Sequence, residues 1–270
     1  MDAESELQIF RKALPQRIRL REISQLIGRA KGKVCLDAGF DNGIMSRTLR
    51  KQDGAWQTLV RDPARAAQVS AVLGDKVSVF DGKTLPYPDK TFDIVVLSGL
   101  LEHVQDDNVV ITECHRVLKP AALLIVDVRH AKRWSIINTL ESTLGLTPQR
   151  LALAREGYSE SQLFHLLKGG FDVHALRSYS GIFTQLVDVL VRHQLNQCPP
   201  ETRDEQAVGI YSRAFPLYWI AFQLLDVLAV FTKGYRLLAY AKRHAWHSRE
   251  PPVLNDGRSL PDVVVSRIRG

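Results

Sequence analysis

The sequence predicts a doubly wound α/β fold around a seven-stranded, mostly parallel sheet, with a helical insertion before the last strand. Two observations lead to this prediction. Apolar runs alternate with helical patterns five times within about 100 residues, which is typical of a parallel sheet with helices on both faces. The runs are also apolar throughout, as expected for strands that are covered on both sides.

Composition and charge narrow the class of protein. The 270 residues are 45% hydrophobic and 24% charged, which is ordinary for a globular protein. The cysteines at 35, 114 and 198 lie far apart without a CxxC pair, so we expect no metal site, no disulfide framework and a reducing, cytoplasmic setting. Residues 1–12 do not resemble a signal peptide. The net charge of +7 fits an unspecialised basic surface, a nucleic-acid site or contact with an anionic membrane.

The elements follow in order along the chain. Residues 7–29 predict an amphipathic helix that ends near Gly28. We expect strands at 33–39, 55–60, 76–82, 92–99, 122–128, 171–180 and 234–243, and helices at 44–52, 62–74, 106–120 (stopped by Pro120) and 159–170 (capped by Ser159). The expected organisation is an N-terminal helix (1–30), a core (31–180), a helical insertion (181–233), a last strand (234–247) and a flexible tail (248–270).

The stretch CLDAGFDNGIMS, residues 35–46, runs from a strand through a glycine turn into a helix. Such a turn lets backbone approach a nucleotide. Asp37 and Asp41 would repel the pyrophosphate of a dinucleotide, whereas a ligand with an ammonium group and a cationic centre suits them. Asp41 has two open interpretations: it caps the following helix, or it senses the ammonium group of the ligand.

Four segments together resemble one enzyme family. VCLDAGFDNG, Asp62 after the second strand, DGKTLPYPDKTFDIVV, and LSGLLEHVQDDNVVITECHRVLKP stand in the order found in class I S-adenosylmethionine (SAM)-dependent methyltransferases of the small-molecule type 11 group. The resemblance covers residues 34–128. Two departures are Asp41 in place of the middle glycine of the loop, and Ala121–Ala122 in place of the usual glycine pair after Lys119–Pro120.

The resemblance implies SAM as cofactor and a set of residues that bind it. Asp62 would hold the ribose hydroxyls, Asp81 would face the adenine amino group, and Gly82 would neighbour the ring. Asp62 as a plain helix cap and Asp81 as a plain turn residue stay open. The full set implied to bind the cofactor is Asp37, Gly39, Phe40, Asp41, Asn42, Gly43, Asp62, Asp81, Gly82 and Ser98.

The expected reaction is in-line transfer of the methyl group to oxygen or nitrogen of a small-molecule or lipid-linked acceptor. This chemistry needs positioning above all, so no dedicated base is required; His103, His130 and Tyr158 are weak candidates. One alternative is a nucleic-acid methyltransferase, although no Asn-Pro-Pro-type sequence follows the fourth strand, so nucleic acid is a disfavoured partner. The other alternative is a non-catalytic binding protein with this fold.

Residues 214–231, AFPLYWIAFQLLDVLAVF, are the informative part of the insertion. The apolar run is short for a membrane span, and Asp226 near its centre would be costly in lipid. Aromatic ends and basic flanks suit a helix that lies in a membrane surface. Two other interpretations stay open: the helix packs over the sheet or over an apolar substrate, or it spans the membrane. The sequence thus leaves open a peripheral contact of 214–236 with the inner face of the membrane.

Overall fold

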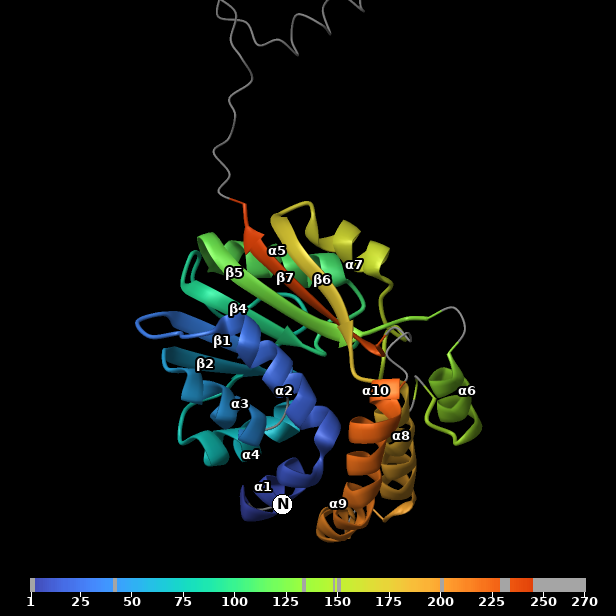
Figure 1. Cartoon of the computed structure of the whole chain (residues 1–270). Coiled ribbons are helices and arrows are strands. Elements are labelled where there is room, and N and C mark those ends of the chain that lie inside the picture. Colours follow the sequence, from blue (N-terminus) through green and yellow to red (C-terminus); the bar gives the residue numbers. More distant parts are fainter. Residues whose placement is uncertain are drawn as a thin grey trace, which may run out of the picture.

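A single seven-stranded sheet organises the protein (Figure 1). The computed structural model describes residues 3–40, 43–132, 135–147, 149, 152–199, 202–228 and 234–244. The strands are β1 (Val34–Ala38), β2 (Ala55–Val60), β3 (Ser78–Val79), β4 (Phe92–Ser98), β5 (Leu118–Arg129), β6 (Phe171–Tyr179) and β7 (Arg236–Arg243). Their order is β3-β2-β1-β4-β5-β7-β6, and only β7 is antiparallel to its neighbours, β5 and β6. The predicted fold class is confirmed.

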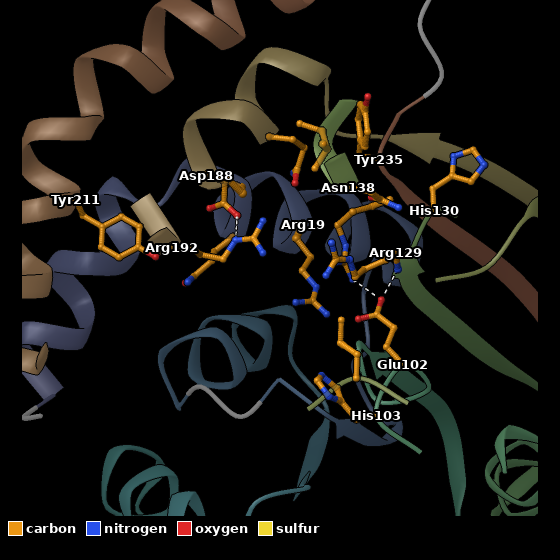
Figure 2. Close-up of a pocket in the computed structure, with 16 residues that line it drawn as sticks. Arg19, Glu102, His103, Arg129, His130, Asn138, Asp188, Arg192, Tyr211 and Tyr235 are labelled. Atoms are coloured by element: carbon orange, nitrogen blue, oxygen red, sulfur yellow. Dashed lines mark hydrogen bonds and ion pairs between the residues drawn. The ribbon is translucent and has the colours of Figure 1, made fainter. Parts of the chain in front are cut away.

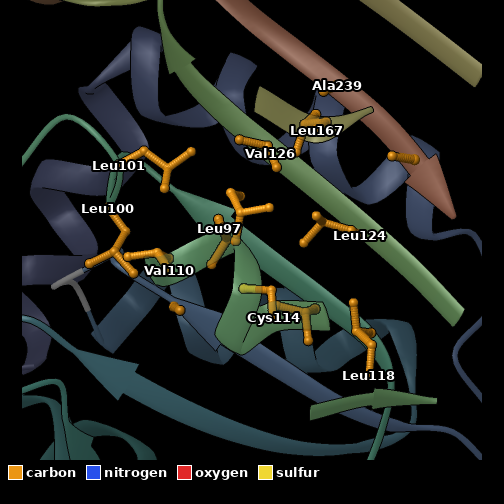
Figure 3. Close-up of a cluster of buried hydrophobic side chains, with 14 of the residues drawn as sticks. Leu97, Leu100, Leu101, Val110, Cys114, Leu118, Leu124, Val126, Leu167 and Ala239 are labelled. Carbon is orange, nitrogen blue, oxygen red and sulfur yellow. The ribbon is translucent and has the colours of Figure 1, made fainter. Parts of the chain in front are cut away.

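Helices cover both faces of the sheet. The helices are α1 (Ala3–Lys12), α2 (Leu14–Ile27), α3 (Gly43–Leu49), α4 (Pro63–Leu73), α5 (Asp107–Val117), α6 (Ile136–Thr143), α7 (Glu160–Leu167), α8 (Ile182–Gln197), α9 (Arg203–Ile220) and α10 (Asp226–Leu228), with a 3-10 turn at Arg50–Gln52 and a π-helical turn at Ala221–Leu225. Strand β4 shows the layering: Ile94 and Val96 pack in the cluster with α2 and α3, whereas Val95 and Leu97 pack in the cluster with α5 and α7 (Figure 3). This double burial explains why the strand is apolar throughout.

The N-terminal segment is two helices, so the prediction of one helix over residues 7–29 is wrong. Helix α1 ends at Lys12, and α2 begins at Leu14 with Pro15 in its first turn. Because Pro15 has no N–H, it cannot donate to the Arg11 carbonyl as a continuous helix would require. The Arg17 guanidinium donates to that carbonyl instead, at 3.1 Å.

Two further boundaries differ from the prediction. The third strand is only Ser78–Val79, because it pairs at the sheet edge with just two residues of β2. The helix predicted over residues 106–120 is α5, which ends at Val117 rather than at Pro120. Strand β5 starts at Leu118 and contains the proline. A register shift on β4 between Phe92 and Ile94 lies opposite this start of β5, which is the kind of irregularity where a strand tolerates proline.

Ala121 has a backbone conformation that favours glycine. Its φ angle is +59°, and this is the position where the methyltransferases that the sequence resembles have a glycine pair. A side chain in this region costs about 1–2 kcal/mol, while glycine adds unfolded-state entropy of about 0.4–1 kcal/mol. We therefore expect Ala121→Gly to raise the free energy of unfolding by about 0.5–1 kcal/mol in urea denaturation, with no change in ligand binding. Ala122→Gly, one position along, should not stabilise.

The insertion is a helical hairpin of α8 and α9 that extends from one end of the sheet (Figure 1). Asp226 lies within its apolar segment, and its carboxylate accepts from the Phe183 amide at 2.8 Å and the Thr184 amide at 3.2 Å. Asp226 therefore caps the start of α8 and ties the two helices together. Within the part of the chain that the structure describes, no helix has both the length and the apolar character needed to cross a bilayer. Phe231, Lys233 and the tail 248–270 lie outside the described residues.

Candidate active site

Asp37 closes strand β1 as a buried carboxylate with one open oxygen. The Thr58 hydroxyl donates to Oδ1 at 2.6 Å, whereas Oδ2 has no hydrogen-bond partner among the described residues. Ser46 lies beside it without making a hydrogen bond of normal geometry. Burial raises the pKa of Asp37, and the hydroxyls of Ser46 and Thr58 and the Arg50 guanidinium oppose this rise. A buried carboxylate oxygen without a partner favours a cationic ligand.

Asp62 and Asp81 show the same division between a held oxygen and an open one. Asp62 follows β2 and caps α4, with Oδ1 accepting from the Ala64 amide at 2.9 Å. Asp81 follows β3, and its Oδ1 accepts from the Lys83 and Thr84 amides, each at 2.7 Å. These two backbone hydrogen bonds lower the pKa of Asp81. Over the described residues, neither Oδ2 has a protein partner, so capping and ligand binding are compatible at both positions.

Gly39 brings the loop after β1 against the end of β4. Its φ angle is +90°, and a Cβ there would lie 2.9 Å from both the Leu100 Cβ and the Ser98 carbonyl oxygen. Gly43 starts α3, and a Cβ on it would lie 2.7 Å from Val72 Cβ of α4. Both glycines are therefore required by close packing. Asp41 and Asn42 lie outside the described residues; Gly82 follows Asp81 with open space where a Cβ would stand.

The predicted cofactor residues thus gather along the edge of the sheet formed by the carboxyl ends of its parallel strands. Asp37, Asp62 and Ser98 stand at the carboxyl ends of the neighbouring strands β1, β2 and β4, and Asp81 follows β3 on the other side of β2. In open parallel sheets this edge is where ligands bind. The three carboxylates with open oxygens fit a ligand that offers an ammonium group, two ribose hydroxyls and an amino group on its base.

A cavity of about 300 Å³ opens beside this edge (Figure 2). Its walls come from α2, the segments after β4 and β5, α6, the insertion hairpin and the start of β7. About half of the exposed wall is polar, and its polar groups include many N–H donors. They carry four arginines, two histidines and two carboxylates: Arg19, Arg129, Arg192, Arg236, His103, His130, Glu102 and Asp188.

Asp127 anchors two of these arginines, Arg19 and Arg236, at the floor of the cavity. It is fully buried at the end of β5 and accepts from Arg236 Nε at 2.9 Å, Arg236 Nη2 at 2.7 Å and Arg19 Nε at 2.5 Å. The Tyr179 hydroxyl donates to it at 2.5 Å and the Ser98 hydroxyl at 3.3 Å. Burial alone would raise the pKa of Asp127, but Arg19 and Arg236 outweigh burial and lower it.

Arg19 connects the cavity to the cofactor loop. Its guanidinium carbon lies 5.8 Å from the ring centre of Phe40, the aromatic residue of that loop, and a Cβ on Gly99 would lie 2.8 Å from its Nη2. Only its Nε has a hydrogen-bond partner in the described parts of the chain, namely Asp127. The two terminal nitrogens of Arg19 are therefore available where the loop and the cavity meet.

The three candidate bases have different surroundings. His103 and His130 both line the cavity, with Nδ1 2.8 Å from the carbonyls of Ala152 and Gly234 respectively. A carbonyl only accepts, so Nδ1 is the protonated nitrogen of each neutral ring. Nε2 of His130 is then unprotonated and suited to accept a proton. Tyr158 is buried, and its hydroxyl donates to Asp107 at 2.9 Å; burial raises its pKa, and it is not a cavity residue.

Sequence reasoning missed the buried network. A polar residue inside the apolar run that forms β5 was the available signal for Asp127. Nothing local indicates that Arg19 on the N-terminal segment reaches Asp127, 108 positions away, or that Arg236 does so from 109 positions on the other side.

Comparison with known proteins agrees with this geometry. Residues 36–126 match the family of methyltransferase domains. Ubiquinone biosynthesis O-methyltransferase of Photorhabdus laumondii is 28% identical over 141 residues, which are 49% of this chain and 58% of that protein. Norajmaline N-methyltransferase of Rauvolfia serpentina is 34% identical over 105 residues, 37% of this chain and 33% of that protein. The chain spans about half the length of the curated relatives it matches.

Solved structures show the same fold over most of the chain. Geranyl diphosphate C-methyltransferase of Streptomyces coelicolor, in a complex that includes S-adenosyl-L-homocysteine, aligns over 84% of this chain and 76% of its own, with a TM-score of 0.55 at 11% identity. This identity is low, so the likeness concerns the fold. The domain match covers residues 36–126, about a third of the chain, and the structural likeness shows that the fold is that of a methyltransferase.

Proposed function

We propose that this protein is a methyltransferase that uses SAM to methylate oxygen or nitrogen of a small-molecule or lipid-linked acceptor. One observation carries the proposal. In Asp37, Asp62 and Asp81, one carboxylate oxygen accepts a hydrogen bond from within the protein, and the other has no partner among the described residues. They stand at the edge of the sheet where a class I domain binds its cofactor. The relatives named above support small-molecule acceptors.

The cavity supports one kind of acceptor. Its arginine-rich walls favour an acceptor whose reacting end carries oxygen atoms, such as a carboxylate, phosphate or phenol group. Arg236 is held rigidly by Asp127 through two hydrogen bonds, so it can orient such a group without first becoming ordered. This polar lining argues against the wholly apolar acceptor that residues 214–231 alone would favour.

Bound SAM supplies a methyl group on a cationic sulfur, which is transferred by in-line displacement. The protein's part is positioning. Asp62 would hold the ribose hydroxyls, and Asp37 would stabilise the positive end of the cofactor. Arg19 and Arg236 would orient the acceptor, and His130, which lines the cavity, would take a proton from it through Nε2.

Asp62 offers a test that separates ribose binding from helix capping. We expect Asp62→Ala to weaken S-adenosylhomocysteine binding at least tenfold in calorimetry, and Asp62→Asn to weaken it severalfold, because asparagine still caps a helix but loses the charge. Asp106→Ala is the matched control, since Asp106 caps α5 through the Asn108 amide at 3.0 Å. It should lose a similar stability of about 1 kcal/mol and retain binding.

Two results would contradict the proposal. Absence of S-adenosylhomocysteine binding by the folded wild-type protein would remove the enzyme function. Equal binding by Asp62→Ala and Asp106→Ala would reduce Asp62 to a cap.

The acceptor class can be found with methyl-labelled SAM. The protein is incubated with an organic-solvent lipid extract, an aqueous small-molecule extract or total RNA from the producing cells. We expect the labelled methyl group to appear in the lipid extract or in the aqueous extract. Label in the lipid extract would show that the acceptor is lipid-linked. Label in RNA alone would overturn the proposal.

A further inference from the structure

The second half of the insertion presents an exposed apolar surface. Leu217, Trp219, Ile220, Leu224 and Val227 form what we term the α9 surface, and they are 54%, 56%, 50%, 58% and 64% exposed. Leu217, Trp219 and Ile220 belong to the last turn of α9, Leu224 to the π-helical turn and Val227 to α10. Ala214 and Tyr218 of α9 are buried against α1 and α8, and Ala221 is buried as well. The helix is thus packed on one side and exposes large apolar side chains on the other.

Arginines without ion-pair partners border this surface. Arg17 and Arg21 of α2 line a groove of about 240 Å³ with Phe215, Trp219 and Phe222, and the groove contains no carboxylate. Arg213 is exposed one turn before Leu217. In the described part of the chain, none of these three arginines has an ion pair with an acidic side chain. A positively charged rim around an apolar centre is complementary to lipid headgroup phosphates above acyl chains.

We propose that the α9 surface docks the protein on an anionic lipid bilayer. The apolar side chains enter the boundary between headgroups and acyl chains, while Arg17, Arg21 and Arg213 contact phosphates. Trp219 suits this boundary because its side chain combines a large apolar ring with an N–H donor. The cap on α8 by Asp226 keeps this part of the apolar segment attached to the fold, so the helix lies along the membrane.

The docking surface and the acceptor cavity share the same two helices. Leu14, Arg17 and Ile18 of α2 line the groove, while Pro15, Gln16 and Arg19 line the cavity. Helix α9 contributes Phe215 to the groove and Tyr211 to the cavity. Docking through the α9 surface therefore brings the cavity next to the lipid, where an acceptor with an apolar tail resides. Docking itself requires neither cofactor nor catalysis.

Vesicle flotation of the full chain tests the proposal. We expect binding to vesicles of phosphatidylglycerol and phosphatidylcholine, weaker binding at high salt, and little binding to phosphatidylcholine alone. Leu224→Glu should weaken binding at least about tenfold, and Arg21→Gln about fivefold. Phe164→Glu is the matched control, because Phe164 is 42% exposed on α7 over the other face of the sheet; it should bind like the wild type. Circular dichroism confirms that each variant is folded.

Several outcomes would overturn the proposal. The wild type could bind neither kind of vesicle, or Leu224→Glu could bind as well as Phe164→Glu. A wild-type dimer in light scattering that Leu224→Glu converts to a monomer, without vesicle binding, would assign the α9 surface to a second copy of this chain. Calorimetry with S-adenosylhomocysteine is unaffected by any of these outcomes, so failure of docking is distinct from failure of the proposed function.

Discussion

Asp127→Asn is expected to lower the free energy of unfolding by about 3–5 kcal/mol, the usual effect of removing one partner from a buried ion pair. The substitution removes the carboxylate that the Arg19 and Arg236 guanidinium groups share, and Glu102, 3.7 Å from Arg236 Nη2, remains as the acid beside Arg236. Arg236 loses the acceptor of both its hydrogen bonds, and its side chain is only 16% exposed. Urea denaturation at neutral pH measures the loss.

Asp172→Asn is the control for this loss. Its carboxylate is 65% exposed and pairs with His244 at 3.1 Å, so the substitution should change stability by less than about 0.5 kcal/mol. A similar small change for Asp127→Asn would show that the network contributes nothing to folding.

The stability difference between the wild type and Asp127→Asn should also depend on pH. The arginines lower the pKa of Asp127 in the folded state, so the carboxylate stabilises the fold above its unfolded pKa of about 3.9. That contribution is lost as the pH falls through the folded-state value. The stability difference between wild type and Asp127→Asn should be constant above about pH 5 and shrink below pH 4.

Gly39→Ala is expected to lower stability by about 2–3 kcal/mol and to weaken S-adenosylhomocysteine binding at least tenfold. The φ angle of +90° disfavours a side chain, and the new Cβ would overlap the Ser98 carbonyl oxygen, 2.9 Å away. That oxygen belongs to the backbone of β4 and cannot rotate away, so the loop itself must shift. Urea denaturation and calorimetry give the two effects separately.

Gly209→Ala is the matched control, because this glycine lies inside α9 with open space around it. It should stabilise by about 0.5–1 kcal/mol and leave binding unchanged. Unaltered binding by Gly39→Ala would mean that the loop after β1 does not shape the ligand site.

Local patterns were sufficient for most of the sheet. β4 is an unbroken apolar run because side chains on both of its faces are buried, so its sequence marks it clearly. Ser159 and Gln162 cap α7 reciprocally, and the cap predicted at Ser159 is confirmed. Asp62 could likewise be placed at the end of β2, since a helix cap and a strand end have local signatures.

The rest of the site depends on contacts between distant segments. Arg19 belongs to a helix that sequence reasoning joined to α1, and its role follows only from the way α2 crosses the sheet. Asp226 looked like a costly charge in an apolar run, but its partners are amides about 43 positions earlier. The polar character of the cavity likewise arises where α2, the hairpin and β7 meet, and no one of these segments indicates it alone.

The position of β7 between β5 and β6 determines the order in which the molecule can fold. Strand β6 has β7 as its neighbour in the sheet, so residues 171–179 have no strand to pair with until residues 236–243 arrive. The start of α8 must also wait for its cap from Asp226. Such distant contacts close slowly. We therefore expect β1 to β5 to assemble before the hairpin, β6 and β7 join the sheet.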